Sequence, residues 1–167
     1  MSEPTIRDAT PADAPALAAL HAQIYAEGRW FVGDAVPSAE ALRGRLRGLE
    51  SSRSLYLVAL CGRALCGWLE LHRLPPKKLA HVAVLTLAVG QPYRRRGIAA
   101  RLLARSYPWG RKEGVLKLQL SVRERNEAAL ALYRREGFVL EGRERAQVFD
   151  EGFEDNLVMA KFLEPVD

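Results

Sequence analysis

Apolar residues form runs and alternations that predict strands in the middle of this chain. Leu55–Cys61 and Leu65–His72 are rich in strand-forming residues, and the glycine–arginine pair between them predicts a hairpin. His81–Val89 is almost wholly apolar, which indicates a strand covered on both faces. Leu116–Val122 alternates apolar and polar residues and predicts a further strand.

Shorter patterns predict strands at the two ends of the chain. Thr5–Arg7 forms a short extended start. At the other end, Phe138–Phe149 and Asn156–Leu163 read as two strands joined through a turn at residues 150–152.

Four segments space their apolar residues at three and four positions, and most carry a helix start or stop signal. They are the segment from Thr10 to Gly28, the segment that begins at Ser38, Gly97–Lys112 and Ala128–Glu136. Pro108 lies inside the third and removes one backbone hydrogen bond, so a kink is expected in its last turn.

The order of these elements predicts an α+β fold with a mostly antiparallel sheet. The one parallel step is a crossover in which His81–Val89 leads through the helix at 97–112 to the strand at Leu116–Val122. We expect ligands to bind at the carboxyl end of the first strand of this crossover. A length of 167 residues predicts a single domain, 1–167.

Composition narrows the class of protein. Hydrophobic residues make up 49% and charged residues 27% of the chain, as in soluble globular proteins. The two cysteines, Cys61 and Cys66, do not make a disulfide scaffold, and no zinc-binding spacing is present, so we expect a cytoplasmic protein without a metal. The polar residues before Pro15 do not resemble a signal peptide, and the longest apolar run is too short to span a membrane.

The formal net charge of +5 comes mostly from arginine, which favours an anionic partner. Arg94, Arg95 and Arg96 stand together in a turn that leads from the apolar strand into the helix at Gly97. Unpaired amides at a helix start bind phosphate oxygens, and a glycine lets the ligand approach closely. The alternative is an ordinary charged connection between a strand and a helix.

Two motifs resemble those of the GNAT superfamily of N-acetyltransferases. Arg94-x-x-Gly97-x-Ala99 resembles the family's acetyl-CoA pyrophosphate signature, and Asn126-x-x-Ala129-x-x-x-Tyr133-x-x-x-Gly137-Phe138 is similar to its second cofactor motif. The resemblance extends from Thr5 to Phe162, although before Leu55 it lies only in the pattern of elements.

The resemblance implies a sheet of about seven strands with helices on both faces and one parallel, splayed strand pair. It also implies direct transfer of acetyl from acetyl-CoA to a primary amine of a small molecule, an amino acid or a protein N-terminus, with no metal. Neither a membrane nor nucleic acid is expected as a partner, and a homodimer is left open.

The resemblance also implies a set of cofactor-binding residues: Leu87, Ala88, Val89, Arg94, Arg95, Arg96, Gly97, Ile98, Ala99, Asn126, Ala129 and Tyr133. Val89 would be the best backbone donor to the developing oxyanion. Tyr133 would protonate the departing thiolate, and the competing interpretation is a tyrosine of the core.

The general base is not evident, because Val84 and Thr86 stand where many relatives carry an acid. Glu70 and Glu27 are the candidates, and water or an already neutral amine are the alternatives. The acceptor amine is expected near Trp30 and Phe31, which can wall an apolar pocket, and near the turn at residues 150–154.

Two other classes compete with an enzyme. An acyl-CoA-binding sensor that has lost catalysis fits the missing strand acid. A basic nucleic-acid-binding module is disfavoured, because the basic residues are scattered and no aromatic-interleaved basic stretch offers a stacking platform.

Overall fold

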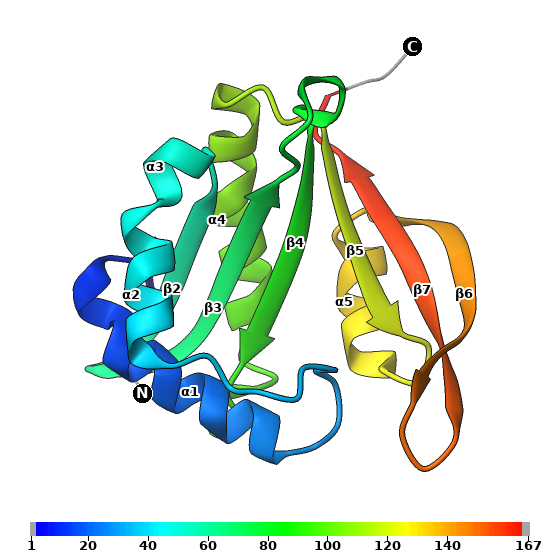
Figure 1. Cartoon of the computed structure of the whole chain (residues 1–167), viewed down its shortest axis with the longest axis horizontal. Coiled ribbons are helices and arrows are strands. Elements are labelled where there is room, and N and C mark those ends of the chain that lie inside the picture. The colour runs from blue at the N-terminus through cyan, green and yellow to red at the C-terminus, as the bar shows by residue number, and fades with distance from the viewer. Residues whose placement is uncertain (1–2, 165–167) are drawn as a thin grey trace.

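The computed structural model describes residues 3–164 and contains one seven-stranded sheet (Figure 1). Its strands lie in the order β1-β2-β3-β4-β5-β7-β6, and only the β4–β5 pair is parallel. The strands are β1 (Thr5–Asp8), β2 (Leu55–Cys61), β3 (Ala64–Arg73), β4 (Val82–Val89), β5 (Lys117–Arg123), β6 (Val139–Phe149) and β7 (Phe153–Phe162). The α+β class, the strand number and the parallel step predicted from the sequence are confirmed.

Helices cover both faces of this sheet, as expected (Figure 1). They are α1 (Ala14–Ala26), α2 (Ala39–Arg47), α3 (Leu49–Ser52), α4 (Ile98–Lys112) and α5 (Glu127–Arg135). Short 3-10 turns lie at Pro11–Asp13, Lys77–Leu79 and Gln91–Tyr93. Helices α1 and α2 pack on one face, and α4 and α5 pack on the other.

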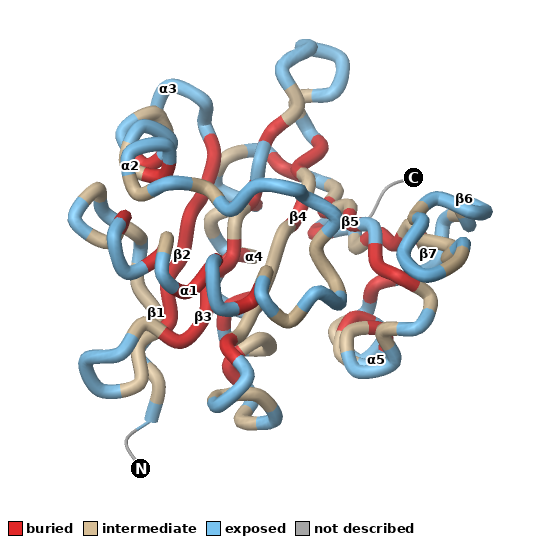
Figure 2. Tube along the Cα trace, turned by 60° about the horizontal axis from the view of Figure 1, so that its bottom comes forward, coloured by how far each residue is buried: buried red, intermediate tan, exposed pale blue. Residues whose placement is uncertain are grey.

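The period-two pattern of β2 and β3 divides the core into two layers. Tyr56 and Trp68 point into the cluster with α1 and α2, whereas their neighbours Leu57 and Leu69 point into the cluster with α4 and α5. All four side chains are buried. In Figure 2, β2 and β3 are buried along most of their length, while the carboxyl half of β4 is only partly buried.

Some element boundaries differ from the sequence-based predictions. Strand β7 begins at Phe153 rather than Asn156, because Phe153 and Glu154 pair with β6 although neither is buried as a core strand residue would be. The helical pattern that begins at Ser38 includes Leu49, but in the structure the short α3 is separated from α2 at Gly48. Helix α4 continues past Pro108 to Lys112. Among residues 3–164, none of the helices has the length and apolar composition that a membrane crossing requires.

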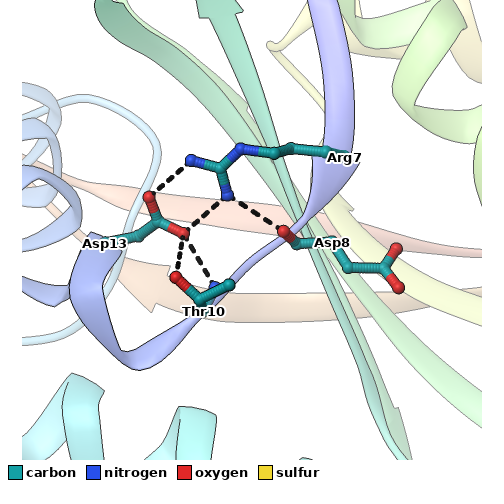
Figure 3. Close-up of polar contacts among 4 residues, drawn as sticks. All are labelled: Arg7, Asp8, Thr10 and Asp13. Carbon is teal, nitrogen blue, oxygen red and sulfur yellow. Dashed lines mark hydrogen bonds and ion pairs between the residues drawn. The ribbon is translucent and has the colours of Figure 1, made fainter.

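An ion-paired carboxylate joins β1 to the start of α1 (Figure 3). Both guanidinium nitrogens of Arg7 donate to Asp13 at 2.8 Å, and the amide of Thr10 donates to the same carboxylate at 2.7 Å. The hydrogen bond from Arg7 is the main reason that the pKa of Asp13 is lowered. The predicted helix start at Thr10 is confirmed, but a single 3-10 turn precedes the α-helix.

Strands β4 and β5 diverge soon after they begin (Figure 1). Their register runs only from Val82 opposite Lys117 to Val84 opposite Gln119. Beyond this point β4 stays paired with β3 as far as Val89, and β5 stays paired with β7 as far as Arg123. The splayed parallel pair implied by the resemblance is therefore present, and it opens the sheet at the carboxyl ends of both strands.

His21 makes the stability of this core dependent on pH. Its ring stacks on Trp68 at 3.8 Å and contacts the Tyr56 hydroxyl through Nε2 at 3.2 Å. Burial, assisted by the charge of Arg45, lowers the pKa of His21 to about 4. The unfolded chain binds this proton near pH 6.5, so the free energy of unfolding should fall as pH drops from about 6.5 to about 4.

We expect His21→Gln to flatten this part of the stability-against-pH curve, whatever its effect at pH 8. Urea unfolding at several pH values measures the slope. The exposed His81 provides a matched control, and His81→Gln should leave the slope unchanged. Equal slopes for wild type and His21→Gln would contradict the prediction.

Candidate active site

The opened edge of β4 presents backbone groups that lack a strand partner. The amide of Gly90 donates to the carbonyl of Cys66 at 2.9 Å. In an antiparallel pair every second residue faces the partner strand, so Ala88 and Thr86 also direct their backbone groups to β3. Leu87 and Val89 therefore direct their amides to the other edge, where β5 has already diverged. Ala88, expected to act with them, is an exception, because its amide faces β3.

A tight turn at residues 94–97 follows β4 and leads into α4. Arg95 and Gly97 both adopt positive φ, 64° and 74°, and a Cβ at Gly97 would meet no atom within 4 Å. The first helical hydrogen bond runs from the amide of Arg101 to the carbonyl of Gly97, so the amides of residues 98–100 have no partner within the helix. This helix start has the geometry of an anion-binding site.

The three consecutive arginines take different positions. Arg94 donates to the carbonyl of Val89 at 2.9 Å and to Glu27 at 2.6 Å, which ties the turn to the end of α1. Arg96 lies over the ring of Tyr93 at 5.8 Å. Of the three, Arg95 alone lines either of the two cavities described next. That all three arginines meet phosphates stays a prediction.

A cavity of about 510 Å³, here called the basic cavity, lies beside this turn. Arg29, Arg95 and Arg125 line it, and Glu127 is its one carboxylate. Asn126 also lines this cavity. It caps α5 by accepting a hydrogen bond from the amide of Ala129 at 3.2 Å. The excess of guanidinium groups suits a ligand with several negative charges.

A second cavity of about 270 Å³, here called the sheet cavity, lies where β4 and β5 separate. Leu85 and Leu87 of β4 face residues 120–123 of β5 across it, and Trp30 and Phe31 close it on the side of the loop after α1. Trp30 and Asn126 line both cavities, so the two adjoin. The predicted apolar wall of Trp30 and Phe31 is thus in place.

Tyr133 of α5 is buried and lines the sheet cavity, as predicted. Its ring packs against Phe138 at 5.4 Å, and its hydroxyl makes no hydrogen bond to another residue in the described part of the chain. Burial alone raises the pKa of Tyr133. The phenol is therefore protonated at neutral pH, and it can donate a hydrogen bond to a ligand.

The two predicted carboxylates lie outside both cavities. Glu27 is paired with Arg94 at 2.6 Å, and Glu70 is paired with Arg45 at 3.2 Å. Neither residue lines the sheet cavity, where no Asp or Glu is found among the described residues. Within the same range, no group of three or more His, Cys, Asp and Glu residues is arranged to hold a metal ion.

Sequence reasoning missed several residues of the sheet cavity, among them Arg123 and Asn156. Arg123 is the last residue of β5, and Asn156 is its register partner on β7. Each is a polar residue of its strand near the opening, in a sequence that carries other polar residues close by. Polar residues at the ends of buried strands could have drawn attention to them, but their pairing depends on a register that the sequence does not show.

Comparisons with known proteins agree with this geometry. Residues 22–138 match the model of the Acetyltransferase (GNAT) family. The N-alpha-acetyltransferase RimI of Mycobacterium tuberculosis is 38% identical over 134 residues, which cover 80% of this chain and 77% of that protein. An acetyltransferase of the GNAT family from Streptococcus pneumoniae has a solved structure that superposes with a TM-score of 0.90 at 28% identity, covering 96% of this chain and 99% of that one.

A third similarity concerns the fold alone. The structure of yncA, a putative acetyltransferase from Salmonella typhimurium with its cofactor acetyl-CoA, superposes with a TM-score of 0.91 at 17% identity, covering 99% of this chain and 97% of that one. The chain belongs to the GNAT family of acetyltransferases. It is an N-acetyltransferase, and its bacterial relatives include enzymes of that activity.

The unequal placement of the arginines predicts unequal effects on acetyl-CoA binding. Arg95→Ala should weaken the affinity for acetyl-CoA by about 10- to 100-fold, the equivalent of one lost charge-assisted hydrogen bond. Arg96→Ala is the matched control, because it removes the same charge from a neighbouring residue that lines neither cavity. Calorimetric titration at two salt concentrations measures both effects. Equal losses in the two variants would show that charge, and not the placement of Arg95, determines affinity.

Proposed function

We propose that acetyl-CoA binds across the two adjoining cavities, with its phosphates at the start of α4 and its thioester in the sheet cavity. The observation that carries this proposal is the sheet cavity itself. Leu87, whose amide lies on the unpaired β4 edge, lines one side of it, and the protonated hydroxyl of Tyr133 comes from α5 on another. Arg95 and the amides of residues 98–100 supply the anion-binding end.

The reaction is direct attack of an amine on the thioester. A bond forms between the amine nitrogen and the acetyl carbon, and the bond from that carbon to sulfur breaks. The backbone amide of Val89 or Leu87 donates a hydrogen bond to the developing oxyanion. The amine gives up its surplus proton to water, the sulfur receives one from Tyr133, and Tyr133 regains its proton from water.

Burial affects both partners of this last proton transfer. It raises the pKa of the Tyr133 hydroxyl, which by itself opposes release of the proton. The same low-dielectric cavity disfavours a free thiolate. Proton transfer concerted with cleavage of the carbon–sulfur bond avoids a free thiolate, and the tyrosinate that forms takes its proton back from water.

The two cysteines are not placed to form a covalent enzyme intermediate in the sheet cavity. Cys66 is buried, and burial raises its pKa to about 12, so its thiolate is scarcely present. Cys61 lies beside it, with 3.0 Å between the two sulfur atoms. Neither cysteine lines the sheet cavity.

The lack of a carboxylate in the sheet cavity favours an acceptor amine that arrives neutral. We therefore expect kcat/KM to rise with pH until the pKa of the acceptor amine is reached. Exchanging the acceptor for one with a lower amine pKa should move the inflection by the same amount. An inflection that stays at one pH for all acceptors would indicate instead a titrating group of the enzyme.

We further propose that the acceptor is the α-amino group of a polypeptide. The similarity to RimI, an N-alpha-acetyltransferase, supports this choice. Chemistry supports it as well, because an α-amine titrates near pH 7.7–8.0 whereas a lysine amine titrates near 10.4. At neutral pH a far larger fraction of α-amines is already neutral.

The test is acetylation of a peptide with a free N-terminus, compared with the same peptide blocked at its N-terminus and carrying an internal lysine. Mass spectrometry should find one added acetyl group on the first peptide, located at its α-amine, and none on the second. Acetylation of the lysine peptide alone would overturn the choice of acceptor. Tight binding of acetyl-CoA without turnover on any amine would favour the acyl-CoA sensor.

A further inference from the structure

Two residues that line the sheet cavity each have a buried polar atom with no hydrogen-bond partner within residues 3–164. The two atoms are Nε of Arg123 and Oδ1 of Asn156. An unsatisfied buried donor or acceptor costs about 1–3 kcal/mol, so native proteins usually pair such groups. A ligand in this cavity that supplies one acceptor and one donor could satisfy both groups, once the two side chains turn toward it.

The two residues stand side by side. Arg123 of β5 is the register partner of Asn156 of β7, and the Cα atoms of such antiparallel partners lie about 4.5–5.5 Å apart. Their free atoms can therefore contact neighbouring atoms of one small group. The cavity they share also holds the Tyr133 hydroxyl and the β4 edge.

The charge of Arg123 is already balanced. Its side chain is 7% exposed, and its Nη1 atom lies 3.4 Å from a carboxylate oxygen of Asp150 and 3.4 Å from one of Glu154. Glu154 is also 3.4 Å from Arg125. A ligand carboxylate placed at Arg123 would be repelled by the carboxylates of Asp150 and Glu154. The Nε–H group therefore suits an uncharged acceptor such as an amide carbonyl.

We propose that this pair recognises the α-aminoacyl unit of the acceptor, that is, an amine with a carbonyl on the adjacent carbon. The carbonyl oxygen accepts a hydrogen bond from Nε of Arg123, and the amine donates one to Oδ1 of Asn156. The amine nitrogen keeps its lone pair for the acetyl carbon. This inference rests on the proposed function, and it adds the residues that select and orient the α-amine.

The proposal separates three kinds of acceptor. An N-terminal residue in peptide linkage supplies both the amine and an uncharged carbonyl. A lysine side chain or simple alkyl amine has no carbonyl in that place. A free amino acid has a carboxylate there, which Asp150 and Glu154 repel.

The test measures KM and kcat for alanine amide and for isopropylamine, which lacks the carbonyl. Arg123→Lys keeps a positive charge for Asp150 and Glu154 but removes the Nε–H group. Asn156→Ala removes the acceptor. For alanine amide we expect each variant to raise KM by about 10-fold, the loss of roughly one hydrogen bond to a buried group. For isopropylamine, Arg123→Lys should change KM by less than about 2-fold, and KM for acetyl-CoA should stay constant throughout.

Arg143→Lys is the matched control, because Arg143 also bridges two carboxylates but lines neither cavity. It should leave both acceptors unaffected. If Arg123→Lys loses acetyl-CoA binding, its fold is damaged, and Asn156→Ser then provides the second measurement.

Different results would overturn the role of Arg123 and Asn156 and the acetyl-transfer function. Asn156→Ala should raise KM for both amines, because both carry the amine that donates to Oδ1. Equal losses on both amines in Arg123→Lys, or no loss on alanine amide in either variant, would overturn the role of Arg123 and Asn156 while leaving acetyl transfer intact. A wild-type enzyme that acetylates neither amine nor any peptide N-terminus would overturn the proposed function itself.

Discussion

Tyr133→Phe should lower the rate of acetyl transfer by about 100- to 10,000-fold, the usual contribution of a general acid. The substitution removes one hydroxyl and leaves the ring that packs on Phe138. Because this buried hydroxyl has no protein hydrogen-bond partner in the described structure, its loss should not lower the free energy of unfolding by more than about 1 kcal/mol. Single-turnover kinetics at saturating acetyl-CoA isolate the chemical step.

Tyr107→Phe is the control for this prediction. Tyr107 is also a tyrosine whose burial raises its pKa, but its hydroxyl donates to Glu136 at 3.1 Å and it lines neither cavity. Its replacement should leave the chemical step unchanged. If Tyr133→Phe retains a rate within about threefold of wild type, Tyr133 is a core residue, and the thiolate takes its proton from water.

Gly97→Val should weaken the affinity for acetyl-CoA by at least about 10-fold. A Cβ at this position would meet no protein atom within 4 Å, so crowding within the protein is not the cause. The cause is φ of +74°, which a β-branched residue tolerates poorly, and the approach of phosphate to the neighbouring amides. The variant must therefore reshape the turn or obstruct the ligand. Calorimetric titration measures the affinity.

The same helix offers a close control. Gly114 follows the other end of α4 and has φ of +72°, and a Cβ there would likewise meet no atom within 4 Å. Gly114→Val should cost a similar amount of stability, while the affinity for acetyl-CoA stays near the wild-type value. Equal affinities in the two variants would show that the turn at Gly97 does not hold the phosphates.

The local parts of the structure could be predicted from the sequence. The strand patterns placed β4 and β5, and the motif at Arg94, Gly97 and Ala99 placed the helix start that follows β4. Asn126 caps α5 and Tyr133 lies in the cavity, as their helical spacing predicted. These features depend on neighbouring residues and on short-range backbone geometry.

The contacts that could not be predicted join distant parts of the chain. Arg94 is paired with Glu27, 67 positions away, so the side chains of one expected phosphate ligand and one expected base contact each other. The pairing of Arg123 with Asn156 depends on the β5–β7 register. In each case the residue type was visible in the sequence, but its partner is set by how the sheet assembles.

The short β4–β5 pairing also has a consequence for the lifetime of the folded enzyme. Strands β1–β4 come from the first part of the chain and β5–β7 from the last, so two contiguous half-sheets meet along three register pairs. A ligand that lies between them and binds only the folded state adds about 2.7 kcal/mol of stability at 100 times its dissociation constant. Supply of the co-substrate would then govern resistance to proteolysis as well as turnover, and starvation for it would shorten the survival of the enzyme.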